Sequence, residues 1–396
     1  MKQKVIVIGR NYSSRLGMIR AVGMAGYDVI VIKTNGLPDS KDIDAYSKYV
    51  KEYHYAKEPN RDELISVLLT LKSDKNKTII IPVDDYAAST IDDNIDLLKD
   101  SFLFPNINME QGAINRLMDK NLQKELARQA GLNVAKGWVL NILNHTYTLP
   151  SDIIYPVFPK PQISFKGNKR CMRKCNDETE LRKVLNDVAS QRDCPMLLEQ
   201  YIEIDEEYAL LGVSNGDDVI IPAKIHMLES GKGPHHGVTL QGQIFPINTD
   251  EDYLDYLKHF IQSLHFSGLF DIDLYESDGV MYFNELNLRF GASGYAVTAA
   301  GINLPQFFLE SLKGGCRNLN NMRVKECLFV NEKVACDDYN NGYISISDYK
   351  EKISQSNICF IKSIEDNGPY EEFLSRNFSY KRRVKRVIKQ LIKHFR

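Results

Sequence analysis

The sequence lacks paired cysteine motifs, long apolar runs and an excess of charge of either sign. Its seven cysteines are scattered, and Cys171 and Cys175 have three residues between them, so neither a disulfide framework nor a zinc site follows. No apolar run is long enough to span a bilayer, and residues 1–4 lead directly into VIVIG, which leaves no room for a signal peptide. We therefore expect a cytoplasmic protein with reduced thiols.

The charge balance and the length set two further limits. Fifty basic and 52 acidic residues give a net charge of −2, which excludes a global attraction to nucleic acid. An apolar content of 43% is typical of a folded globular protein, and 396 residues are too many for one ordinary core. The sequence therefore predicts roughly two to four domains.

Strand and helix patterns alternate at the N-terminus. KVIVIG, a helical stretch and then YDVIVIK form the pattern of a β-α-β unit. The loop from Gly9 to Gly17 does not match G-x-G-x-x-G, so a dinucleotide fingerprint is absent. A later strand, TIIIPVDD, ends in Asp84 and Asp85, at the edge where open α/β sheets usually bind ligands. The alternative is that these carboxylates cap the next helix.

The segment YFNELNLRFG carries polar side chains at alternate positions of a predicted strand. Glu285, Asn287 and Arg289 therefore lie on one face. Upstream, Asp273 lies in LFDIDLYESDG, whose last four residues predict a hairpin turn that brings Asp273 beside Glu285. Facing carboxylates repel unless a divalent cation lies between them, so a metal site is predicted. Asp271 shares this face and remains an alternative direct ligand to Asp273.

Further motifs stand in a fixed order before this hairpin. Lys120 begins a helical pattern, MDKNLQKELARQAGLNV, and Lys160 ends the apolar run of VFPKPQ. MLLEQYIEIDEEYAL follows them as a strand. In order and spacing these elements resemble the ATP-grasp superfamily of the carboxylate-amine ligase type, similar to D-aspartate ligase and carbamoyl-phosphate synthase. The resemblance covers roughly residues 1–312.

The resemblance implies ATP and two Mg²⁺ ions as cofactors, with Mn²⁺ as the alternative metal. The residues that it implies for the nucleotide are Lys120, Lys160, Glu199, Gln200, Tyr201, Ile202, Glu207 and Lys224. The middle four form the adenine hinge, Glu207 contacts the ribose and Lys224 is a third phosphate contact. The implied metal ligands are Asp273, Glu285 and Asn287. Lys160 and Arg289 are the implied catalytic residues, since they stabilise charge on the γ-phosphate and on the intermediate.

The implied reaction is the ATP-dependent joining of a small-molecule carboxylate to an amine. The carboxylate attacks the γ-phosphate to give an acyl phosphate and ADP, and the amine then displaces phosphate to form an amide or peptide bond. A role in cell-surface polysaccharide or peptide synthesis is one interpretation. The alternative is an inactive nucleotide-binding protein that acts as a membrane-associated or regulatory partner, favoured only by the glycine-poor loop SFKGNKR. Relatives are often dimers, so a homodimer is a further option.

The predicted fold class is α/β. The expected domains are a preATP-grasp Rossmann-like domain (residues 1–105), the lid lobe of an α+β ATP-grasp core (106–194), its second lobe (195–313) and a small C-terminal region (314–396). VKECLFV and NGYISIS predict strands in the last region. Residues 381–396 form a basic amphipathic pattern. Such a helix packs on the protein body, lies on an anionic membrane surface or serves a partner protein; nucleic acid is the least supported partner.

One glycine-rich segment, MLESGKGPHHGVTLQG, lies between the hinge and the hairpin. Gly231, Gly233 and Gly237 predict a mobile loop near the site. Its adjacent His235 and His236 are tempting as catalytic groups, but paired loop histidines are more often exposed to solvent.

Overall fold

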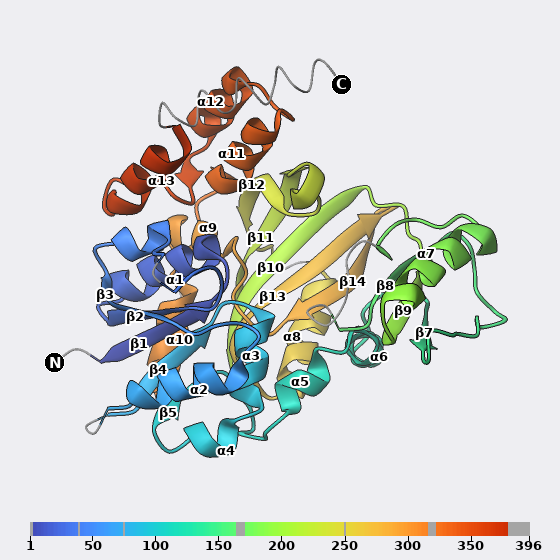
Figure 1. The fold of residues 1–396 in the computed structure, drawn as a ribbon, viewed down its shortest axis with the longest axis horizontal. Coiled ribbons are helices and arrows are strands. Elements are labelled where there is room, and N and C mark those ends of the chain that lie inside the picture. Colours follow the sequence, from blue (N-terminus) through green and yellow to red (C-terminus); the bar gives the residue numbers. More distant parts are fainter. Residues whose placement is uncertain are drawn as a thin grey trace.

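A computed structural model describes residues 3–38, 40–73, 76–163, 171–248, 251–315 and 322–378 of the chain. Its described part contains a parallel sheet, a large and mainly antiparallel sheet, and a small antiparallel sheet, with helices packed on each (Figure 1). The α/β class and the N-terminal parallel sheet that the sequence predicts are confirmed.

The parallel sheet has the strand order β3-β2-β1-β4-β5. Its central strands are nearly continuous runs of buried valine and isoleucine, as expected of strands that helices cover on both faces. Helix α1 packs on one face, and α2 and α3 pack on the other. The elements of this layer are β1 (Lys4–Gly9), α1 (Tyr12–Met24), β2 (Asp28–Lys33), the 3-10 turn η1 (Ile43–Tyr46), β3 (Val50–Tyr55), α2 (Arg61–Thr70), β4 (Thr78–Pro82), α3 (Asp85–Asp92), α4 (Ile95–Leu98) and β5 (Phe102–Leu103).

The large sheet has the order β14-β13-β10-β11-β12-β15-β16, and β6 pairs with β13. Helices α5, α6 and α8 cover one face, and α9 and α10 cover the other. The elements up to α10 are β6 (Asn106–Ile107), α5 (Ala113–Leu117), α6 (Lys120–Gln129), β10 (Glu206–Asn215), β11 (Val219–Ser230), η4 (Gly233–His235), β12 (Thr239–Pro246), α8 (Tyr253–Ser263), β13 (Phe266–Ser277), β14 (Val280–Asn287), α9 (Gly294–Ala299) and α10 (Leu304–Ser311).

The small sheet has the order β7-β9-β8 and forms the lobe at the right of Figure 1. Its strands are β7 (Gly137–Ile142), β8 (Val157–Pro161) and β9 (Cys194–Gln200), and α7 (Glu178–Gln191) packs on them around a separate core. The loop SFKGNKR at residues 164–170 lies outside the described residues.

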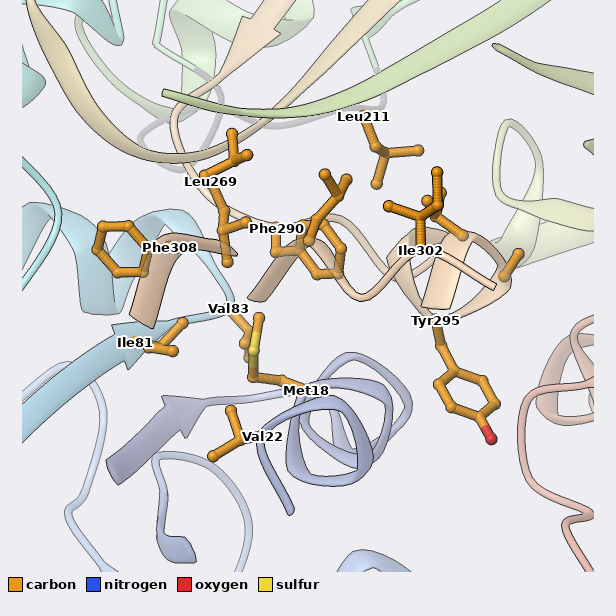
Figure 2. Close-up of a cluster of buried hydrophobic side chains, with 14 of the residues drawn as sticks. Met18, Val22, Ile81, Val83, Leu211, Leu269, Phe290, Tyr295, Ile302 and Phe308 are labelled. Atoms are coloured by element: carbon orange, nitrogen blue, oxygen red, sulfur yellow. The ribbon is translucent and has the colours of Figure 1, made fainter. Parts of the chain in front are cut away.

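One core joins the parallel sheet to the large sheet. Met18 of α1 points toward Phe290, and both belong to one cluster with Val22 of α1, Leu269 of β13 and the helices after the hairpin (Figure 2). Tyr295 of α9 belongs to the same cluster. Burying apolar surface contributes about 25 cal/mol of stability per Å². The aliphatic side chains of this cluster therefore hold the parallel sheet against the large sheet.

The C-terminal region corrects one prediction. VKECLFV forms β15 (Cys327–Val330), as predicted, and pairs with β12. NGYISIS is not a strand: Ser345 caps α12 (Ile346–Gln355), and its side chain and Asp348 form a reciprocal capping box. The remaining elements are α11 (Glu332–Asn341), β16 (Ile358–Cys359) and α13 (Gly368–Phe378). The basic segment 381–396 lies outside the described residues, and among the helices described none is long and apolar enough to cross a bilayer.

Candidate functional site

A cavity of about 140 Å³ lies between the small sheet and the β13–β14 hairpin. Apolar and aromatic side chains form one part of its wall, and charged side chains form the other. The residues predicted from the sequence that line it are Lys120, Lys160, Glu199, Gln200, Tyr201, Ile202 and Glu285. Segments far apart along the chain therefore meet around one space, as the predicted nucleotide site requires.

Glu199 is the charged centre of the cavity wall. It lies near the end of β9 and is only 7% exposed. Lys124 Nζ lies 2.7 Å from its Oε1, and Lys160 Nζ lies 2.6 Å from its Oε2. Burial alone would raise the pKa of Glu199, but the two lysines outweigh it and lower that pKa. Burial and the neighbouring Lys160 lower the pKa of Lys124 to about 8, against the pull of Glu199.

Lys120 opens helix α6 at the other end of the cavity. Asp119 caps this helix by accepting hydrogen bonds from the N–H groups of Asn121 and Leu122. The buried Lys120 ammonium forms an ion pair with Glu285 of the hairpin. The backbone N–H of Lys120 donates to the Gln162 carbonyl at 3.0 Å, so the helix start also contacts the end of the small sheet.

The hinge residues form the end of β9 and the two positions that follow it. The Gln200 N–H donates to the carbonyl of Lys136 at 2.8 Å, and the Tyr201 N–H donates to the carbonyl of Pro156 at 2.9 Å. The rings of Phe158 and Tyr201 have centroids 6.4 Å apart. Aromatic and aliphatic side chains here form the apolar wall that a flat heterocycle needs.

The β13–β14 hairpin has the predicted register. Asp273 lies opposite Glu285, and the turn residues Asp278 and Gly279 both have positive φ, 48° and 73°. The register shifts between Asp273 and the next residue, which leaves Asn284 as an extra residue on β14. This bulge explains how Asn284 and Glu285, although consecutive, both line the cavity. Asn284 Oδ1 accepts a hydrogen bond from Lys160 at 3.2 Å.

Burial and neighbouring carboxylates raise the pKa of Asp271 and of Asp273. Burial raises the pKa of Asp271 to about 6, with Arg289 opposing and Glu285 adding to the shift. Burial, Asp271 and Glu285 together raise the pKa of Asp273 well above its ordinary value. The buried Oδ1 of Asp271 has no hydrogen-bond partner among the described residues. Asn287 Nδ2 donates to Asp273 Oδ2 at 3.3 Å, which sets a further oxygen-bearing side chain beside the carboxylates.

These oxygen donors fit a hard divalent cation such as Mg²⁺, because such a cation would remove the repulsion and occupy the orphaned oxygen. In the part of the chain that is described, no three His, Cys, Asp or Glu side chains converge in a preformed ligand set. Glu285 is engaged by Lys120 instead. The hairpin carboxylates therefore lie close together, but they do not surround a common point as the ligands of a bound metal ion would.

Arg289 follows the end of β14 and links the hairpin to the parallel sheet. Its Nη2 donates to Asn287 Oδ1 at 3.1 Å, and its Nε donates to Asp85 Oδ1 at 2.8 Å. Asp84 has the capping role: its Oδ1 accepts from the N–H of Ala87 at 2.9 Å. Only the second carboxylate of TIIIPVDD therefore reaches the site.

Two of the predicted nucleotide residues do not line the cavity. Lys224 pairs across the strands with Leu210, on the face opposite the hairpin carboxylates, and its Nζ lies 2.8 Å from Glu251 Oε1. The structure therefore separates Lys224 from the predicted phosphate region. Glu207 lies beside the cavity-lining Tyr275 in the strand register, and burial raises its pKa.

The glycine-rich loop after β11 packs on α11. The Lys232 N–H donates to both carboxylate oxygens of Asp338, at 3.2 and 3.0 Å. His235 Nε2 lies 3.0 Å from Asp337 Oδ2. A side chain at Gly231 would meet Val334 at 2.5 Å, so the glycine permits close packing. His235 therefore has a structural partner, and the mobile loop near the site stays a prediction.

Among the cavity residues that the sequence interpretation missed are Lys124 and Asn284. Lys124 lies one helical turn after Lys120, so its position on the same face could have been noticed. Nothing in the local sequence marks the bulge that exposes Asn284 to the cavity.

The comparisons with known proteins agree with this geometry. The ATP-grasp domain model matches residues 125–307. The carbamoyl phosphate synthase large chain of Clostridium beijerinckii is 24% identical over 302 residues, which are 72% of this chain and 27% of that protein. The chain thus spans about a quarter of the length of this relative.

Solved structures show the same fold at low identity. The biotin carboxylase domain of Hydrogenobacter thermophilus 2-oxoglutarate carboxylase, a dimer in complex with MgADP, ADP and bicarbonate, has a TM-score of 0.63 and 19% identity, over 83% of this chain and 74% of that one. The L-amino acid ligase from Bacillus licheniformis has a TM-score of 0.60 and 15% identity, over 83% and 79%.

Proposed function

The chain is an ATP-grasp domain protein, distantly related to the carbamoyl phosphate synthase large chain, and from this premise we propose that it joins a small-molecule carboxylate to an amine. ATP is converted to ADP and phosphate in the reaction. One observation carries the proposal: buried lysines and a carboxylate-rich hairpin meet at a single cavity, with Lys120 paired to Glu285 across it.

The nucleotide would lie with its adenine against the hinge, at Glu199 to Ile202, and with its phosphates toward Lys120 and Lys160. These lysines would exchange their carboxylate partners for phosphate oxygens, because a polyphosphate offers a stronger and multidentate anion. When Lys120 binds phosphate, its ion pair with Glu285 is broken. Asp273, Glu285 and Asn287 would then hold Mg²⁺, which when bound neutralises charge on the phosphate oxygens.

Arg289 lies beside the proposed metal ligands, where its guanidinium would bind an anion. The substrate carboxylate attacks the γ-phosphorus, the bond to the β-phosphate oxygen breaks, and ADP leaves. The Arg289 guanidinium would hold the acyl phosphate while Asp85 fixes its orientation. An amine then attacks the acyl carbon, phosphate leaves with the bonding electrons, and the amine loses one proton. No nucleophilic side chain is required.

The second candidate is a nucleotide-binding protein without turnover. Its only support is the glycine-poor loop at residues 164–170, outside the described part of the chain. The ligase is preferred because lysines suited to phosphate line the cavity together with Glu285, whose hairpin also carries Asp273 and Asn287. A homodimer and a membrane contact through residues 381–396 remain further proposals.

The test is release of ADP and phosphate from MgATP across a panel of amino acids, sugar acids and bicarbonate, with hydroxylamine as a general acceptor. Hydroxylamine converts an acyl phosphate into a hydroxamate. A carboxylate-dependent hydroxamate supports the ligase and identifies its acid. Formation of AMP contradicts the proposed chemistry. ATP binding without turnover across the panel favours the second candidate.

A further inference from the structure

Lys124 and Lys160 both connect the small sheet with the α6–hairpin side of the cavity, but they start from opposite sides. Lys124 belongs to α6, which is fixed to the hairpin because the Gln123 side chain exchanges two hydrogen bonds with the backbone of Leu286, at 2.8 and 2.9 Å. From there Lys124 reaches Glu199 in the small sheet. Lys160 starts in the small sheet and reaches Asn284 on the hairpin. Both lysines also meet on the same carboxylate, one on each oxygen.

This arrangement gives one buried carboxylate two cations, although one would neutralise it. Glu199 and both lysines are almost fully buried, at 7%, 4% and 4% exposure. A buried carboxylate without a cation is strongly destabilising, because water no longer solvates it. If Lys160 were the only partner of Glu199, its transfer to a nucleotide phosphate would leave such a carboxylate behind.

We propose that Lys124 is a positioning residue for nucleotide binding: it keeps Glu199 neutralised so that Lys160 is free to bind phosphate. The inference rests on the proposed ATP site and assigns Lys124 no contact with phosphate. Lys124 acts through Glu199, whereas Lys120 and Lys160 act on the nucleotide directly. Its effect should therefore depend on the charge of Glu199.

A double-mutant cycle separates this role from a direct phosphate contact. Affinities for MgATP and for adenosine are measured by calorimetry at pH 7 for the full-length wild type, Lys124→Met, Glu199→Gln and the double variant. At pH 7 Lys124 is charged, because its pKa is lowered only to about 8. Lys124→Arg tests rescue by a retained charge, Lys183→Met is the surface control, and thermal unfolding checks that each variant is folded.

Lys124→Met is expected to weaken MgATP binding by about tenfold or more, the usual effect of losing a charged hydrogen bond, and adenosine binding much less. In the Glu199→Gln background the same change should cost little, because no carboxylate then holds Lys160. Lys124→Arg should restore most of the affinity. If Lys124→Met fails to fold, Lys124→Gln replaces it in the cycle.

Two results would overturn the role of Lys124 and leave the ligase proposal standing. One is an equal loss of MgATP affinity in both backgrounds, which would make Lys124 a direct phosphate ligand. The other is an equal loss for adenosine and MgATP, which would make it a purely structural residue. A folded wild-type protein that binds no nucleotide would overturn both proposals.

Discussion

Replacement of Asp271 by asparagine is expected to stabilise the metal-free protein at alkaline pH. Asp271 is 9% exposed, and its Oδ1 has no hydrogen-bond partner in the described part of the chain. Burial raises its pKa from 3.8 to about 6, although Arg289 opposes the shift. The folded protein therefore holds this proton more tightly than the unfolded chain does.

The sign and size of the effect follow from this difference. Well below pH 3.8 the carboxyl is protonated in both states and costs nothing. As the pH rises through 3.8 toward about 6, the unfolded chain loses the proton first, so the free energy of unfolding falls; well above pH 6 the loss is complete. Two pKa units correspond to about 3 kcal/mol. The neutral amide of the variant would carry no such loss, so the advantage of Asp271→Asn is smaller at about pH 5 and grows to about 3 kcal/mol at about pH 8.

Urea unfolding in EDTA at pH 5 and pH 8 measures this advantage as a shift in the free energy of unfolding. Asp187→Asn, at an exposed position on α7, is the matched control and should show no comparable change. Added Mg²⁺ should stabilise the wild type more than Asp271→Asn, because the cation compensates the carboxylate. A variant that is less stable than the wild type at pH 8, or a difference that does not change with pH, would refute the reasoning.

Three further predictions concern the same region. Glu285→Gln should abolish ATP turnover while leaving the protein folded; activity in a folded variant would remove Glu285 from the site. Gly291→Ala should lower the free energy of unfolding by about 1–3 kcal/mol in urea, because its methyl group would overlap Asp271 Oδ2; unchanged stability would contradict that clash. Asp85→Asn should lower kcat by about tenfold or more, because Arg289 loses a charged partner. A change confined to the KM for ATP would exclude that role.

Local sequence was sufficient to predict the hairpin. A two-residue Asp-Gly turn pairs Ser277 with Val280, and spacing alone would then set Asp273 opposite Asn284; the bulge makes Glu285 the partner instead. The bulge at Asn284 could not be predicted, because it depends on how the strand twists against its neighbour. The buried strands of the parallel sheet were also readable, since their apolar runs require cover on both faces.

Contacts between distant segments were harder to predict. Lys124 resembles a solvated helical lysine, and only the approach of Glu199 from another sheet explains its burial. The sequence did not reveal on which face of the sheet the Lys224 side chain lies, because a shift of one residue moves a side chain to the opposite face. At Ser345, alternating apolar residues suggested a strand, but the capping box favours a helix start.

The shared core of Figure 2 constrains how this protein can be recombined with its relatives. Met18 of the first layer packs in one cluster with Leu269 and Phe290 of the second, so the two layers do not form interchangeable cassettes. A chimera that imports only residues 1–105 from another protein would bring an unmatched surface against α9 and α10. Grafts should therefore carry α9 and α10 with the N-terminal segment, or redesign both sides of the seam together.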